Sequence, residues 1–123
     1  MAGSYKELRA WKQSMELALE IYRYTESFPR EERYGLTSQL RRSAVSVSSN
    51  IAEGKGRSSD KELVLFLHHA RGSLLEVETQ LLIARELRYG RGDELDSGRL
   101  LDLVETLAKT LNALIRSLRP IAA

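Results

Sequence analysis

Residues 60–89 read DKELVLFLHHARGSLLEVETQLLIARELRY, and this stretch decides the fold. Apolar side chains recur in it at spacings of three and four residues, which places them along one face of a helix. That face comprises Leu63, Leu67, Ala70, Leu74, Val77, Leu81 and Ala84. Ser59 and Glu62 are spaced as a capping box at its start. We therefore expect one long helix over residues 60–89.

Three further stretches, residues 7–26, 33–53 and 94–119, have the same periodicity, and glycine or proline lies in the gaps between them. No stretch alternates with the period of two that is typical of a strand. The expected core stripes are Leu8, Trp11, Met15, Leu19 and Tyr22 in the first stretch, Leu36, Leu40, Ala44, Val47 and Ile51 in the second, and Leu100, Val104, Leu107, Leu111, Leu114 and Leu118 in the last.

The four stripes also agree in register. Facing residues of an antiparallel helical hairpin have a nearly constant sum of residue numbers, and each consecutive pair of stripes satisfies this rule. Leu19 then lies opposite Leu40, and Leu40, Leu74 and Leu111 share one layer. Short connections and consistent registers predict an all-α fold, an antiparallel up-down-up-down four-helix bundle that forms a single domain over residues 1–123.

Composition excludes several kinds of chemistry. The chain has 123 residues and no cysteine, so disulfides and thiol chemistry are ruled out. His68 and His69 are adjacent and diverge by about 100° on a helix, so they cannot share one metal ion. The Glu-x-x-His pairs of di-iron bundles do not occur in the sequence. We expect no cofactor, no metal site and no enzymatic activity.

The sequence also predicts where the protein resides. No apolar stretch approaches the roughly 20 residues that a membrane span needs. The N-terminal residues carry no apolar run of the kind found in signal peptides. We therefore expect a cytoplasmic protein without membrane association.

A second apolar stripe on the first stretch, with Leu17, Ile21 and Tyr24, lies roughly opposite its expected core face. A stripe that the core does not need is typical of a contact between subunits, so we take these residues as a candidate oligomer interface. The alternative is a wide core face with scattered exposed leucines. Arg41 and Glu76, on facing helices and at nearly the same level along the axis, are expected to form an ion pair. The alternative is that they bind a ligand.

Positive charge is concentrated at one end of the expected bundle. The whole chain has a net charge of only +2, but this end combines eight basic with four acidic residues. Six of the cations are candidate nucleic-acid contacts: Lys12, Lys55, Arg57, Lys61, Arg116 and Arg119. A basic face attracts polyanions. The alternative is that these charges complement helix dipoles and keep the protein soluble. The loop of residues 53–59 is either an anion site at a helix N-terminus or an ordinary solvated turn.

Several motifs resemble those of a known family. The residues that carry the likeness are Leu8-x-x-Trp11, Phe28-Pro29, Tyr34-Gly35-Leu36, Gln39-Leu40-Arg41-Arg42-Ser43-Ala44-Val45-Ser46, Asn50-Ile51-Ala52-Glu53-Gly54 and Ala70-Arg71-Gly72-Ser73-Leu74-Leu75-Glu76. The sequence resembles the bacterial four-helix-bundle intervening-sequence proteins, some of which are encoded inside insertions in large-subunit ribosomal RNA genes. The resemblance implies a ring-shaped homopentamer and kinship with accessory proteins of diversity-generating retroelements, which bind nucleic acid and a reverse transcriptase.

Two functions are compatible with these observations. The first is a non-enzymatic homo-oligomer, expected to be a pentamer, whose basic end binds RNA or DNA as an accessory to a reverse transcriptase. The alternative is a structural or protein-interaction module without nucleic-acid binding.

Overall fold

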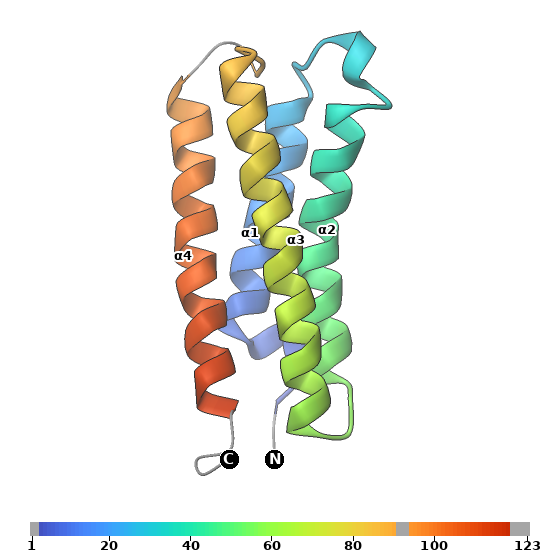
Figure 1. Cartoon of the computed structure of the whole chain (residues 1–123), viewed down its shortest axis with the longest axis vertical. Helices are drawn as coiled ribbons and strands as arrows, with labels where there is room; N and C mark the ends of the chain where they lie inside the picture. Colours follow the sequence, from blue (N-terminus) through green and yellow to red (C-terminus); the bar gives the residue numbers. More distant parts are fainter. Residues whose placement is uncertain (1–2, 91–93, 119–123) are drawn as a thin grey trace.

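The computed structural model describes residues 3–90 and 94–118, and the chain forms four long helices there (Figure 1). They are α1 (Arg9–Thr25), α2 (Leu36–Lys55), α3 (Asp60–Glu86) and α4 (Glu94–Leu118), and the short 3-10 helices Tyr5–Glu7 and Arg30–Glu32 precede α1 and α2. The chain runs up α1, down α2, up α3 and down α4. The expected four-helix bundle is confirmed, and no described residue lies in a strand.

Each helix packs against two neighbours in the bundle. α1 contacts α2 and α4, α3 contacts α2 and α4, and the described residues form no close contact across either diagonal. The side of the bundle between α1 and α2 is therefore opposite the side between α3 and α4. α2 and α3 lie close together at Gly54, where an added Cβ would lie 2.7 Å from the Cβ of Phe66.

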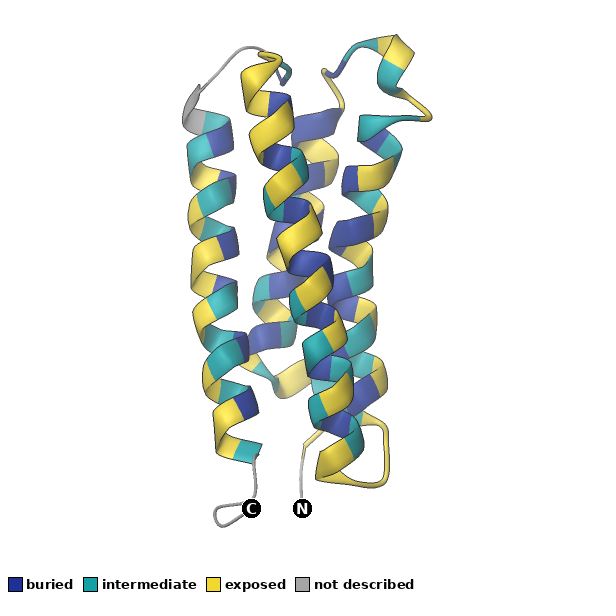
Figure 2. Cartoon of the chain, viewed as in Figure 1, coloured by how far each residue is buried: buried dark blue, intermediate teal, exposed yellow. Residues whose placement is uncertain are grey.

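The expected core stripes of α2, α3 and α4 are largely correct (Figure 2). Buried residues recur along each of these helices in Figure 2. Leu40, Leu74 and Leu111 are all buried in the core, as expected. Leu114 is only half-buried, and Ile115 is buried at the lower end of α4.

The expected core stripe of α1 is wrong. Leu17, Ile21 and Tyr24 are only 1%, 0% and 6% exposed, whereas Leu19 and Tyr22 are 51% and 42% exposed. The candidate oligomer interface is thus part of the core of a single chain, and it is not available to a second subunit. The buried face of α1 carries small residues, and the Ser48 hydroxyl donates a hydrogen bond to Ser14 Oγ across a distance of 2.9 Å. Small side chains let α1 and α2 approach closely enough for this contact.

Glu32 joins two connections at the upper end of the bundle. Its Oε1 accepts a hydrogen bond from the Leu36 backbone N–H at 2.9 Å, and its Oε2 accepts one from the Tyr89 hydroxyl at 2.9 Å. The bond to the carboxylate raises the pKa of Tyr89 above its ordinary value. Burial raises the pKa of Tyr24, whose hydroxyl donates to the Tyr89 carbonyl. Gly90 has a φ of +75°, and a Cβ there would overlap the Tyr24 ring.

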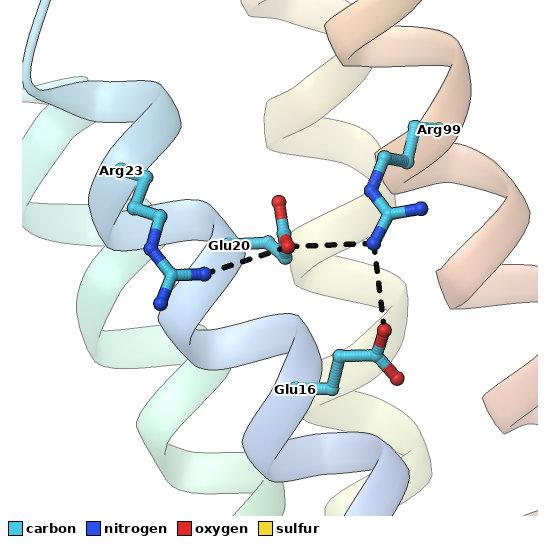
Figure 3. Close-up of polar contacts among 4 residues, drawn as sticks. All are labelled: Glu16, Glu20, Arg23 and Arg99. Atoms are coloured by element: carbon cyan, nitrogen blue, oxygen red, sulfur yellow. Dashed lines mark hydrogen bonds and ion pairs between the residues drawn. The ribbon is translucent and has the colours of Figure 1, made fainter.

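An exposed cluster of charges joins α1 to α4 (Figure 3). Arg99 lies 3.5 Å from Glu16 and 3.4 Å from Glu20, and Arg23 lies 3.5 Å from Glu20. Because these side chains are well solvated, each pair contributes at most about 1 kcal/mol to stability.

The expected ion pair between Arg41 and Glu76 does not form. Arg41 instead donates hydrogen bonds to Thr25 Oγ1 at 2.8 Å and to the Tyr22 carbonyl at 3.2 Å, and its guanidinium lies 4.6 Å from the centre of the Tyr22 ring. A cation at the C-terminus of a helix satisfies its terminal carbonyl groups and complements its dipole. Arg41 therefore fastens the end of α1 to α2.

Candidate nucleic-acid interface

The lower end of the bundle brings together the start of α1, the connection between α2 and α3, and the end of α4 (Figure 1). Lys55 is the last residue of α2, Lys61 lies in the first turn of α3, and Arg116 lies in the last turn of α4. Arg116 and Lys61 are exposed, and Lys55 is half-buried. Cations from three helices therefore lie at the same end of the molecule.

Lys12 lies on the same half of the bundle but farther from its end. Ser14 is level with Ser48, so Lys12 is level with Asn50, five residues before Lys55. At a rise of 1.5 Å per residue, this places Lys12 about 8 Å above the end of α2. Its side chain is exposed. Arg119 falls outside the described residues.

Arg57 differs from the other cations because its charge is already paired. Its guanidinium lies 2.6 Å from a carboxylate oxygen of Glu53 and 4.7 Å from the centre of the Phe66 ring. This contact holds the turn between α2 and α3 against the first turns of α3. Arg57 is thus less available to a phosphate than the sequence alone indicated.

The N-terminus of α3 also has a hydrogen-bonding cap and negative charge supplied by the chain itself. Ser59 Oγ accepts a hydrogen bond from the Glu62 N–H at 3.2 Å, which is one half of the expected capping box. The Glu62 carboxylate accepts a hydrogen bond from the Ser58 hydroxyl at 3.3 Å instead of closing the box on Ser59. Asp60 and Glu62 place negative charge in this first turn. The arrangement favours a solvated turn over an anion site, so phosphate binding would depend on side-chain cations.

The remaining cations have no such partner. Within residues 3–90 and 94–118, none of the ion pairs involves Lys12, Lys55, Lys61 or Arg116. The connection between α2 and α3 and the first two residues of α3, residues 56–61, are exposed throughout (Figure 2). Unpaired cations on long side chains suit sequence-independent contacts with phosphates rather than recognition of base edges.

The described residues contain no group of three or more side chains suited to hold a metal ion, and none of their helices is long and apolar enough to span a membrane. His68 Nδ1 is hydrogen-bonded to Arg71, which donates to Asn112 on α4. The ring of His69 meets the Phe66 ring edge-on.

Sequence reasoning missed an exposed apolar groove between α1 and α2. Its lining includes Trp11, Met15, Leu19, Tyr22 and Val45. The available signal was the presence of two apolar stripes on α1, of which a four-helix bundle needs one. The stripe that was assigned to the core is the one that lines this groove.

The fold and the site define the class: a small four-helix bundle in which three helices place cations at one end. The model of the family described as 23S rRNA-intervening sequence protein matches residues 6–113. The chain belongs to this family, and the match extends well into α4. No curated protein matches the chain.

Proposed function

We propose that this chain is a non-enzymatic, oligomer-forming protein whose basic end binds the phosphate backbone of RNA or DNA. The single observation that supports this most directly is the gathering of Lys55, Lys61 and Arg116 from three helices at one end without ion-pair partners. A cluster of this kind carries an unfavourable self-repulsion that a polyanion relieves.

The few contacts available per chain make oligomerisation important to this function. Each phosphate contact adds modestly to affinity, and the basic end of a single bundle offers only a handful of unpaired cations. Several basic ends held on one side of an assembly raise the effective concentration of the later contacts. A homopentamer, which the family resemblance suggests, would multiply the charge fivefold.

The family name points to the first nucleic acid to test. It refers to the intervening sequences of 23S ribosomal RNA, so a fragment of structured ribosomal RNA is the natural probe, with duplex DNA beside it. A reverse transcriptase is the protein partner that we propose from the retroelement resemblance, since it would act on the same nucleic acid.

The test removes the unpaired cations while leaving Arg57 in place. We expect Lys55→Glu with Lys61→Glu to weaken binding at least tenfold and to lower the slope of log affinity against log salt by about 1.5. Fluorescence anisotropy at low and moderate salt measures both quantities. The matched control is Arg30→Glu with Arg33→Glu, which makes the same charge change at the opposite end of the bundle and should bind nearly as tightly as the wild type.

Two outcomes would reject this function. Equal losses of nucleic-acid affinity in the two double variants would show that binding depends on net charge and not on the basic end. A wild type that fails to bind either nucleic acid at low salt would favour the alternative, a protein-interaction module, for which the exposed apolar groove between α1 and α2 is the specific supporting observation.

A further inference from the structure

A polar pocket of about 310 Å³ lies between α2 and α3. We call it the α2–α3 pocket. Its volume is at the lower limit of the range typical of small-molecule sites. Every residue that lines it is polar or charged: Gln39, Arg42, Ser43 and Ser46 from α2, and Glu76 and Gln80 from α3.

The lower limit of the α2–α3 pocket is a closed hydrogen-bond network. The hydroxyls of Ser46 and Ser73 are hydrogen-bonded at 2.9 Å, and the Asn50 side-chain amide donates to the Ser46 carbonyl at 2.9 Å. Ser46 is therefore level with Ser73. Because α2 and α3 are antiparallel, Ser43 is then level with Glu76, and the next turn upward brings Gln39 level with Gln80. These two upper levels form the pocket.

Two buried polar groups at these levels have no partner within the part of the chain that the structure describes. Gln80 Oε1 is buried and accepts no hydrogen bond. Ser43 is only 7% exposed, and no described residue is hydrogen-bonded to its hydroxyl. Buried polar groups are normally hydrogen-bonded, so these two need a partner that the described chain does not supply.

The two charges of the α2–α3 pocket are also unpaired. Arg42 and Glu76 are exposed and differ in level by one residue, yet neither forms an ion pair with a described residue. Arg41, the partner that the sequence indicated for Glu76, binds Thr25 instead. The pocket thus offers one cation and one anion to a molecule that carries both charges.

We propose that the α2–α3 pocket binds a free α-amino acid with a polar side chain. The Arg42 guanidinium donates two parallel hydrogen bonds to the α-carboxylate, which is the geometry that arginine favours. The Ser43 hydroxyl donates to the same carboxylate. The Glu76 carboxylate accepts hydrogen bonds from the α-ammonium group. A zwitterion therefore satisfies both charges at once, and a ligand with a single charge leaves one of them without a partner.

The glutamines select the rest of the ligand. A turn about the last side-chain torsion of Gln80, which is soft, brings its Oε1 toward the pocket as a further acceptor for the ammonium group. Gln39 supplies a second amide at the same level, and no apolar residue lines the pocket. A ligand side chain that forms hydrogen bonds, such as that of glutamine, asparagine or serine, suits these amides better than an aliphatic one.

The α2–α3 pocket is separate from the basic end. Arg42 lies about 20 Å above Lys55 along α2, at a rise of roughly 1.5 Å per residue. The inference therefore goes beyond the proposed function and does not rest on nucleic-acid binding. It assigns the protein a small-molecule ligand in addition to a polyanion.

Isothermal titration calorimetry of the full chain tests the class of ligand. The probes are L-glutamine, L-asparagine and L-serine, with L-leucine as the aliphatic comparison. We expect at least one of the three polar amino acids to bind and L-leucine to bind at least about tenfold more weakly. The α-amide of the best ligand lacks the carboxylate and its N-acetyl derivative lacks the ammonium group, so each should lose at least about tenfold in affinity.

Two charge-removing variants test the location of the site. Arg42→Gln and Glu76→Gln should each weaken binding at least about tenfold, because each removes one charged partner of the ligand. Both residues are exposed, so the helical circular dichroism should not change. The matched controls are Arg9→Gln and Glu86→Gln, which remove the same charges from exposed positions outside the pocket and should bind as the wild type does.

Ser43→Ala separates a ligand contact from a structural role. It should weaken binding at least about threefold. The melting temperature of the ligand-free protein should stay the same or rise, because the hydroxyl has no partner among the described residues and alanine is the better helix former.

Four results would overturn the inference. They are a wild type that binds none of the polar amino acids at millimolar concentration, an α-amide or N-acetyl derivative that binds as tightly as the free amino acid, control variants that lose as much affinity as the pocket variants, and a Ser43→Ala protein that is less stable but binds normally. Anisotropy measurements with nucleic acid on the same samples would show separately whether the basic end functions.

Discussion

Ile21 and Leu19 are two residues apart on α1 but lie on opposite sides of the helix, one fully buried and one 51% exposed. Truncating each to alanine tests which stripe forms the core. Ile21→Ala removes three buried carbons, which costs about 2.4 kcal/mol in transfer free energy at ~0.8 kcal/mol per carbon. The cavity left behind brings the expected loss to about 3–4 kcal/mol.

Leu19→Ala should cost much less. Half of the Leu19 side chain is already in water, so the transfer term is halved to about 1.2 kcal/mol. Alanine's higher helix propensity offsets a small part of this loss. The two variants should thus differ in unfolding free energy by at least about 2 kcal/mol.

Urea unfolding followed by circular dichroism measures this difference. Assembly makes stability depend on protein concentration, so the titration is repeated at two concentrations. The loss of unfolding free energy caused by Ile21→Ala should be the same at both concentrations, because Ile21 is buried within a single chain. A larger loss from Leu19→Ala than from Ile21→Ala at the lower concentration would refute the assignment of the α1 core.

Two further predictions concern the upper end of the bundle. Gly90→Ala should lower stability by at least about 1–2 kcal/mol in thermal unfolding, because alanine tolerates a positive φ poorly and its Cβ would meet the Tyr24 ring; an unchanged melting temperature would contradict this. Glu32→Gln should lower the pKa of Tyr89 toward its ordinary value, as measured by ultraviolet titration. Since the folded state raises that pKa, the wild type should be stabilised by this contact below pH 10 and lose the contribution as pH rises through the folded pKa.

The positions of the helices follow from local sequence. Leu40, Leu74 and Leu111 recur in stripes whose spacing marks both the helix and its inward face, and all three are buried. Every described helix end lies within three residues of the expected position, because Pro29, Gly56 and Gly90 mark the connections. The grouping of Lys55, Lys61 and Arg116 at one end follows in turn, since short connections fix which helix ends meet.

The availability of each cation was not predictable in the same way. Arg57 lies in a glycine-containing connection, where the sequence alone indicates a solvated side chain. Its guanidinium nevertheless pairs with Glu53 and lies over the Phe66 ring. Arg41 was assigned to Glu76 from their levels along the axis, yet it binds Thr25 on the other neighbouring helix. The register determines the level of each residue along the bundle axis. The direction of a long side chain depends on all the partners within its reach.

The sequence by itself determined the number of helices, their order, the buried faces of α2 and α3, and the family. The tertiary structure alone decided which of two apolar stripes on α1 turns inward. Both stripes have helical spacing, so periodicity cannot separate them. The difference arises between helices: the face with Ser14 approaches α2 closely enough for its hydroxyl to meet Ser48, and the bulkier Leu19 and Tyr22 are left exposed. Burial depends on both of the surfaces that pack together, and the pattern of a single helix describes only one of them.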